Sequence, residues 1–214
     1  EVIEAHKLAG AIDPETRVIE LLTEVGLPDP AIIRTQYPFR LSGGQRQRVM
    51  IAMALALEPT LLIADEPTTA LDVTTQAQIL ALIRDLQQRR GMAVMFITHD
   101  FEEAIRLADR IAIMQDGEII QVGTPEELVL RPETEYVSEF TRGIPRAKVL
   151  TARAVMEPPQ EGDYAGKVDV SVKLQELAAR IIDAQKPFAV VDEKGNTIGQ
   201  VRKDSVLNVL IDQE

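Results

Sequence analysis

The sequence has no cysteine, and its acidic residues outnumber its basic ones. Without cysteine the 214-residue chain can form neither disulfide bonds nor thiolate metal sites, which fits a reducing cytosol. Its 34 aspartates and glutamates against 23 lysines and arginines give a net charge of −11. Because nucleic-acid binding is favoured by a surplus of positive charge, this balance predicts no nucleic-acid partner.

The sequence also lacks a long hydrophobic run and a targeting segment. Its longest apolar stretch, residues 49–57, is about half of the ~20 residues that a membrane-spanning helix needs. Residues 1–8 lack the basic flank and apolar centre of a targeting signal, and the first residue is Glu1 rather than Met. We therefore expect a chain that does not cross a bilayer and that is a piece of a longer protein. The 45% hydrophobic and 27% charged residues are typical of a folded globular protein.

The first 60 residues have a helical pattern. Asp13 and Pro14 predict an N-capped helix, and Gly26 ends its apolar periodicity. No strand pattern occurs over residues 1–40. The sequence therefore predicts a helical subdomain over residues 1–60.

Residues 61–150 have the alternating pattern of an α/β layer. The apolar runs 61–64 and 93–97 flank an amphipathic stretch at 73–90, which predicts two parallel strands joined by a helix. Asp116-Gly117 is a strong hairpin signal between two further apolar runs. We expect the sheet to end in this antiparallel pair.

The remaining residues, 151–214, have the pattern of a small α+β module. A linker-like stretch at 157–163 precedes helix, strand, turn, strand and helix signals between residues 174 and 210, which suggest a βαββα unit. A unit of about 60 residues is marginal by itself, so we expect it to pair with another copy.

Four short segments are candidates for chemistry, and the first is Ser42-Gly43-Gly44-Gln45. Ser42 is a good helix N-cap, and the two glycines allow a backbone to approach a ligand closely. The N–H groups at the start of the following helix can face an anion. The plainer interpretation is a helix start after a glycine turn.

The second and third segments follow the apolar run at 61–64. Asp65 and Glu66 lie at the carboxyl edge of the expected strand, where α/β sheets bind ligands. One carboxylate can hold Mg²⁺ while the other orients or deprotonates a water molecule, although the pair could also be a solvated loop. Asp72, in the third segment, could simply cap the helix that begins at Val73.

The fourth segment contains His99, which follows the apolar run 93–97 and should share an edge with Asp65. A single histidine is usually structural, but one at the ligand edge of a sheet can contact a phosphate. Asp100 should cap the next helix, with Glu103 completing a capping box.

Taken together, these segments resemble the ATP-binding subunit of an ATP-binding-cassette (ABC) transporter over roughly residues 1–150. Residues 41–45 are similar to the family signature, 61–66 to the Walker B strand, 70–72 to the D-loop and His99 to the switch histidine. The resemblance implies a partial P-loop NTPase of the α/β class with a helical subdomain.

The resemblance also implies roles for the candidate residues. Asp65 would support Mg²⁺, Glu66 would polarise the hydrolytic water, and His99 would contact the γ-phosphate. The residues that would contact the ATP of a second subunit, in a head-to-tail dimer, are Ser42, Gly43, Gly44, Gln45 and Asp72.

One part of the family pattern is missing, because the chain has no Gly-x-x-x-x-Gly-Lys-Ser/Thr phosphate loop. Without this Walker A loop nothing cradles the α- and β-phosphates. In the family the loop lies upstream of the signature, so we expect the C-terminal part of a longer ATPase that is inactive by itself. The alternative is a degenerate regulatory binding module that does not hydrolyse ATP.

Two kinds of importer compete as the nearest resemblance. Residues 46–55 and 66–74 resemble peptide and nickel importers, whereas residues 96–140 resemble glycine betaine/proline (quaternary amine) importers. Peptide-importer subunits usually continue into a cysteine-bearing segment, and quaternary-amine importers continue into cystathionine-β-synthase-type (CBS) modules, which residues 187–204 resemble. A further alternative is a soluble cassette ATPase that acts in translation or repair. The tail of the chain, which follows Ala147, argues against this alternative.

The glycine betaine/proline resemblance implies a place and partners for the protein. It would be an ATPase at the cytoplasmic face of the plasma (inner) membrane, bound peripherally to transmembrane permease subunits and served by a solute-binding protein. It would energise the uptake of compatible solutes for osmoprotection. Arg202 and Lys203 stand where ligand-binding CBS members carry Ser or Thr, so we expect the tail to respond to salt rather than to an adenosyl ligand.

Overall fold

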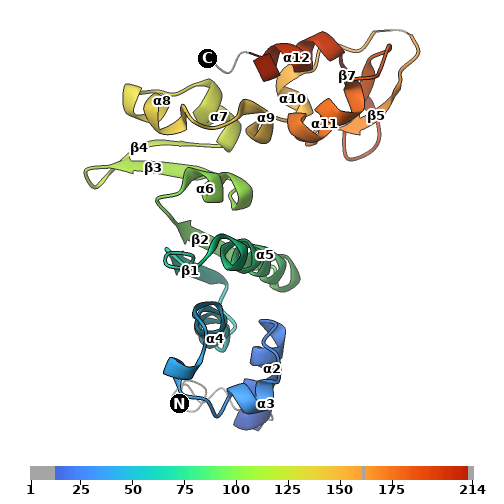
Figure 1. Cartoon of the computed structure of the whole chain (residues 1–214). Coiled ribbons are helices and arrows are strands. Elements are labelled where there is room, and N and C mark those ends of the chain that lie inside the picture. The colour runs from blue at the N-terminus through green and yellow to red at the C-terminus, as the bar shows by residue number, and fades with distance from the viewer. Residues whose placement is uncertain (1–12, 161, 212–214) are drawn as a thin grey trace. The chain divides into compact units, whose positions relative to one another are not determined.

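The structure, a computed structural model, describes residues 13–160 and 162–211. The chain divides into two compact units, residues 1–107 and residues 108–214, and each is described by itself. The colours of Figure 1 follow the chain through both units from blue to red. The part of the predicted helical subdomain over residues 1–12 lies outside the described residues.

The described part of unit 1 begins with helices, as the sequence predicts. They are α2 (Pro14–Glu24), α3 (Pro30–Ile33), a 3₁₀ turn (Pro38–Arg40) and α4 (Gly43–Leu55). Asp13 caps α2 by accepting the backbone N–H of Thr16 at 3.0 Å, and Gly26 follows the helix with a left-handed φ of 70°. No strand occurs over the described residues 13–40, which confirms the prediction for that stretch.

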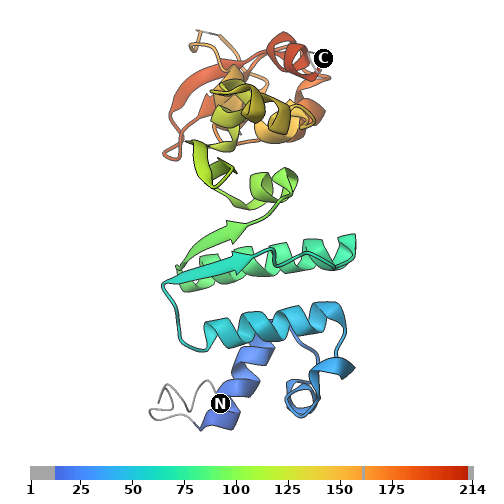
Figure 2. The same ribbon diagram turned by 90° about the vertical axis from the view of Figure 1, so that its left-hand side faces the viewer.

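A parallel strand pair with its connecting helix forms the rest of unit 1. The elements are β1 (Leu61–Asp65), α5 (Val73–Arg90), β2 (Ala93–Ile97) and α6 (Phe101–Leu107). In Figure 2, β1 runs along α5, and the shared core of Leu62 with Ile79 and Ile83 shows that this helix covers one face of the sheet. Asp65 lies opposite Ile97, so both strands end at the same edge.

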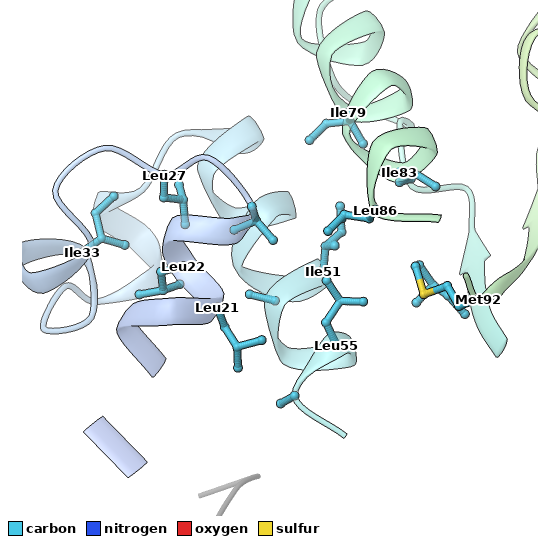
Figure 3. Packing of buried hydrophobic residues seen from close by; sticks show 14 residues of the cluster. Leu21, Leu22, Leu27, Ile33, Ile51, Leu55, Ile79, Ile83, Leu86 and Met92 are labelled. Atoms are coloured by element: carbon cyan, nitrogen blue, oxygen red, sulfur yellow. The ribbon is translucent and has the colours of Figure 1, made fainter. Parts of the chain in front are cut away.

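One core holds α2, α3, α4, α5 and the two strands of unit 1 together (Figure 3). Its side chains come from α2, α4, α5 and the strands, and they include Leu21, Leu22, Ile51, Leu55, Ile79, Ile83, Leu86 and Met92. Two hydrogen bonds of 2.8 and 2.5 Å join Arg90, the last residue of α5, to the carboxylate of Glu24, the last residue of α2. Both ends of α5 are therefore anchored, its start by the cap at Asp72 and its end by this ion pair.

The predicted hairpin forms, but it does not extend the first sheet. β3 (Ile111–Gln115) and β4 (Glu118–Gly123) pair in antiparallel register as a separate two-stranded sheet in unit 2. Asp116 and Gly117 have φ of 51° and 83°, which is the pair of left-handed conformations that this tight turn requires. The expectation that the first sheet ends in this pair is wrong, because the hairpin signal specifies only a local pairing and not the neighbouring strand.

Four short helices follow the hairpin in unit 2. They are α7 (Pro125–Leu130), α8 (Glu135–Thr141), α9 (Arg146–Val149) and α10 (Ala152–Val155). A capping box between Thr124 and Glu127 starts α7. The buried side chain of Gln121 in β4 binds the carbonyl of Arg131 and the N–H of Glu133, which fixes the turn after α7.

The tail has the predicted βαββα order. It consists of β5 (Gly166–Asp169), α11 (Leu174–Ile181), β6 (Phe188–Val191), β7 (Thr197–Val201) and α12 (Lys203–Ile211). β5 and β6 are parallel, and β6 and β7 are antiparallel. The hydrophobic core of the tail includes Ala147 and Leu150, so this core begins before β5.

The first residue of the predicted linker is fixed in the structure. Glu157 exchanges two backbone hydrogen bonds of 2.9 Å with Gln200 in β7, and its carboxylate accepts the hydroxyl of Ser205 at 3.1 Å. Its backbone carbonyl lies so close to Gly199 that a Cβ there would approach to 2.9 Å. Glu157 is therefore held in the fold, although the composition of this stretch is typical of a linker.

Candidate functional site

The carboxyl edge of β1 and β2 brings two of the predicted residues into contact. The Nε2 atom of His99 lies 3.0 Å from an Oε atom of Glu66. The other Oε atom of Glu66 accepts the hydroxyl of Thr69 at 2.9 Å. The backbone N–H of Glu66 donates to the carbonyl of Ile97 at 2.9 Å, which ties the two strand ends together.

The backbone at Glu66 is unusual. Its φ of 43° lies in the left-handed region, which is energetically unfavourable for a residue that has a Cβ atom, and Ala70 in the following turn shares this conformation. This conformation ends β1 and turns the chain into residues 67–72. Asp65, one residue earlier, still pairs within the sheet, so the two adjacent acids have different surroundings.

The pair of Glu66 and His99 is open to solvent. The side chain of His99 is 93% exposed and that of Glu66 is 38% exposed. A carboxylate held by a hydroxyl and an imidazole in this way can accept a proton from a water molecule, and the imidazole beside it can donate to an anion. The geometry therefore suits proton transfer to or from a bound water near a phosphate.

Asp65 is the predicted metal ligand. It is an exposed carboxylate at the end of β1. Among residues 13–160 and 162–211, no group of three or more histidines, aspartates or glutamates is arranged to hold a metal ion. Mg²⁺ commonly uses only one or two protein carboxylates together with substrate phosphates, so Asp65 fits a magnesium site of that kind.

The predicted anion-binding segment forms the start of α4. Ser42 and Gln45 form a reciprocal capping box: the hydroxyl of Ser42 accepts the N–H of Gln45 at 3.3 Å, and the Gln45 side chain accepts the N–H of Ser42 at 2.9 Å. A Cβ on Gly43 would come within 3.2 Å of Leu71, and one on Gly44 within 2.6 Å of Thr75. Close packing against Thr75 in α5 thus favours glycine at position 44 even without a ligand.

Asp72 caps α5, which is the plainer of its two predicted roles. Its carboxylate accepts the N–H of Thr75 at 3.0 Å and the hydroxyl of Thr75 at 2.7 Å. The backbone hydrogen bond from Thr75, and then the one from its hydroxyl, hold the pKa of Asp72 below its usual value. Through Leu71 and Thr75, this turn lies against the glycines of α4.

The structure therefore sorts the predicted site residues into two groups. Glu66 and His99 are in contact at the strand edge, beside Asp65. Ser42, Gly43, Gly44 and Gln45 begin α4, which packs on the turn that contains Asp72. The hydrogen bonds that the structure gives Ser42 and Gln45 stay within this cap.

The sequence analysis missed the role of Glu103. Asp100 accepts the N–H groups of Glu102 and Glu103 at 2.8 and 3.4 Å, as predicted. The Glu103 side chain does not complete the capping box, which corrects the prediction, because it turns inward to Thr68, Gln76 and Thr98. The only available signal was the placement of one threonine after each of two parallel strands.

Within the described part of the chain, no helix combines the length and the apolar composition that crossing a membrane requires.

Comparisons with known proteins place these features in a family context. Residues 2–69 match the ABC transporter family model. The chain is 40% identical, over 94% of its length, to the trimethylamine N-oxide transport system ATP-binding protein TmoW of Pelagibacter ubique, and covers 59% of that protein. It is 42% identical, again over 94%, to the peptidoglycan transport ATP-binding protein YejF of Agrobacterium fabrum, and covers 37% of it.

The chain is also similar to a further curated relative and to part of a solved structure. The dipeptide transport ATP-binding protein DppD of Escherichia coli is 46% identical over 79% of this chain, which covers 51% of it. A solved dimeric bacterial ABC transporter cassette is 37% identical, with a TM-score of 0.49, over 56% of this chain and 52% of that one. The chain thus spans between about a third and three fifths of the length of the curated relatives described here.

The chain is therefore similar, over the shares given above, to ATP-binding subunits of ABC transporters. These relatives divide between transporters of trimethylamine N-oxide and transporters of peptides or peptidoglycan. The names of these relatives say nothing of a CBS module, so that interpretation of residues 151–214 stays a prediction.

Proposed function

We propose that this chain is the C-terminal part of an ATP-hydrolysing subunit of an ABC importer, with its catalytic residues at the carboxyl edge of β1 and β2. The 3.0 Å contact between Glu66 and His99 is the observation that carries the proposal. It unites two residues that lie 33 positions apart in the sequence at the edge where α/β sheets bind ligands. Homology to ATP-binding subunits supports the same assignment.

The residues at this edge have different roles in hydrolysis. Glu66, held by Thr69 and His99, orients the attacking water and accepts its proton. His99 donates a hydrogen bond to an oxygen of the γ-phosphate. Asp65 holds Mg²⁺, which neutralises phosphate charge when it is bound.

The β1–β2 pair of unit 1 has one uncovered face, which fits a complete subunit whose phosphate loop lies in another part of the cassette. One face of the β1–β2 pair packs on α5, whereas Leu61, Ile63, Met95 and Ile97 are exposed on the other. Parallel sheets are normally covered on both faces. We propose that the part of the cassette with the phosphate loop covers this apolar face and supplies the lysine for the γ-phosphate.

The start of α4 serves a second subunit in this proposal. Ser42, Gly43, Gly44 and Gln45 would face the ATP held by the neighbouring cassette of a head-to-tail dimer, with Asp72 beside them. The capping box holds this helix start in one geometry, and the N–H groups of the first turn favour an anion. The dimer would bind peripherally to transmembrane permease subunits at the cytoplasmic face of the plasma membrane.

The proposed solute is a small compatible solute of the glycine betaine and proline type. Two TmoW proteins match 94% and 91% of the chain, so this similarity includes the tail. Peptide import is the second candidate, because the dipeptide transport ATP-binding protein DppD matches 79% of the chain. Uptake of labelled glycine betaine and of a labelled peptide by the reconstituted complex separates the two.

The tail is proposed to regulate transport as a CBS-type module. Its β5-β6-β7 sheet with two helices supports a compact module. Arg202 and Lys203 lie exposed between β7 and the body of α12, where charge contacts weaken as salt rises. Unchanged salt dependence of transport after deletion of residues 157–214 would contradict this role.

The hydrolytic role is tested by Glu66→Gln in the longer subunit that carries a phosphate loop. The amide keeps the size of the side chain but cannot accept the proton, so ATP binding should persist while hydrolysis slows by about 10²–10⁴. The measurement is steady-state phosphate release beside equilibrium binding of ATP. Wild-type turnover in this variant would remove Glu66 from the mechanism.

A further inference from the structure

A buried carboxylate links the two strand ends that hold the proposed site. Glu103 is 3% exposed and lies in the first turn of α6. One of its oxygens accepts the hydroxyl of Thr68 at 2.6 Å and the side-chain amide of Gln76 at 2.5 Å. The other accepts the hydroxyl of Thr98 at 2.6 Å. Because a buried carboxylate without donors is costly, these three bonds must be kept for the fold to tolerate Glu103 here.

The donors belong to the segments that carry Glu66 and His99. Thr68 lies two residues after Glu66 in the same turn, and Thr98 directly precedes His99. The hydroxyl of Thr98 also accepts the N–H of Asp100 at 3.0 Å, so it fixes the backbone on the far side of His99. Glu103 therefore connects the turn after β1 to the turn after β2.

We propose that Glu103 is a positioning residue, which keeps Glu66 and His99 at hydrogen-bond distance by holding Thr68 and Thr98. Its importance for ATP hydrolysis rests on the proposed function, whereas the positioning does not. Gln76, near the start of α5, is the third side chain that binds Glu103. The network therefore anchors both turns to α5. Loss of the network should change the geometry of the pair before it changes nucleotide affinity.

The positioning can be tested on the full 214-residue chain by NMR of the histidine side chains. Long-range ¹H–¹⁵N spectra report the Nε2 chemical shift of His99, and the same signal in Glu66→Ala gives the reference without the carboxylate. We expect Glu103→Ala to move the Nε2 signal towards that reference. Glu103→Gln should stay near the wild-type position, because its carbonyl still accepts from Thr68 and Gln76 and its amide N–H can donate to the hydroxyl oxygen of Thr98.

Two further variants make the outcome decisive. Thr98→Val removes one donor and nearly keeps the side-chain shape, so it replaces Glu103→Ala if that variant does not fold. Glu24→Gln breaks the ion pair at the opposite end of α5 and should leave the Nε2 signal unchanged. An Nε2 signal of His99 that stays at the wild-type position in folded Glu103→Ala or Thr98→Val would overturn the proposal.

The consequence for hydrolysis is measured in the longer subunit that carries a phosphate loop. There Glu103→Ala should lower kcat about tenfold or more, since small displacements of catalytic groups are costly, while the KM for ATP changes less than about twofold. Wild-type kcat in Glu103→Ala, when Glu66→Gln is slow, overturns the positioning role. Wild-type kcat in Glu66→Gln instead refutes the proposed function and leaves the NMR result standing.

Discussion

At the scale of single residues, the chain uses carboxylates in three distinct ways. Glu66 is half-exposed and contacts an imidazole, Glu103 is buried among neutral donors, and Glu24 forms an ion pair with Arg90. The surroundings and not the residue type decide the role. For the ion pair of Glu24 and Arg90, the structure predicts an effect of pH on stability that can be measured.

Replacing Glu24 should change how stability depends on pH. The bonds from Arg90 hold the pKa of Glu24 below its usual value, against the opposing effect of burial. A depressed pKa stabilises the fold above the unfolded-state pKa of about 4.3, and this contribution is lost as pH falls through the folded-state value. Glu24→Gln should cost about 1–3 kcal/mol at pH 7 and flatten the loss of stability below pH 4.5.

Urea unfolding at pH 7 and at pH 3.5 measures both effects. Glu15→Gln is the matched control, because the Glu15–Arg34 pair is largely exposed and should contribute little at either pH. Parallel pH curves for Glu24→Gln and the wild type would contradict this account of the ion pair.

Residue-scale patterns also set the limit of the sequence analysis. The caps of Asp13, Ser42 and Asp72 were predictable, because a cap depends on residues three positions away. The same local rule misassigned the side chain of Glu103. Its donors Thr68 and Gln76 lie 35 and 27 positions away, and no local pattern shows that the fold brings them beneath the strand ends.

At the scale of secondary-structure elements, α4 packs closely on the start of α5. The Cγ2 atom of Thr75 would lie 2.6 Å from a Cβ on Gly44. The Thr75 side chain cannot rotate away without losing its 2.7 Å bond to Asp72. Strain here would therefore disturb the cap of α5 as well as the first turn of α4.

Gly44→Ala should destabilise the chain by about 1–3 kcal/mol, which is the usual range for overpacking, although alanine favours the helix. Thr75→Ser removes the clashing methyl and keeps the hydroxyl, so the double variant should recover most of the loss. Gly143→Ala is the control, because a Cβ there meets nothing within 4 Å. Thermal and urea unfolding give the values, and a Gly44→Ala variant as stable as the wild type would refute the packing argument.

Element boundaries were predictable where the chain marks both ends. The helix expected at 73–90 is observed with those bounds, between the Asp72 cap and Gly91 with its left-handed φ of 62°. The hairpin at Asp116-Gly117 was equally clear. Its assignment to the first sheet failed, because the order of strands depends on contacts that neither strand encodes locally.

At the scale of the whole molecule, the residues that the structure describes form two hydrophobic cores. One joins α2, α4, α5, β1 and β2, and the other lies in the tail and begins near Ala147. The first places the Glu66–His99 pair at an exposed edge, and the second builds a compact module with no predicted part in hydrolysis. We propose that the first core belongs to an ATPase unit and the second to a regulatory one.

The central claim is that Glu66 and His99 act as one unit in ATP hydrolysis. A double-mutant cycle of Glu66→Gln and His99→Ala in the longer, phosphate-loop-containing subunit tests it most directly, with single-turnover hydrolysis as the measured rate. Groups that act as a unit are strongly non-additive. We predict that each change slows hydrolysis and that the double variant is hardly slower than the worse single one; fully additive losses, or a wild-type rate in either single variant, would contradict the claim.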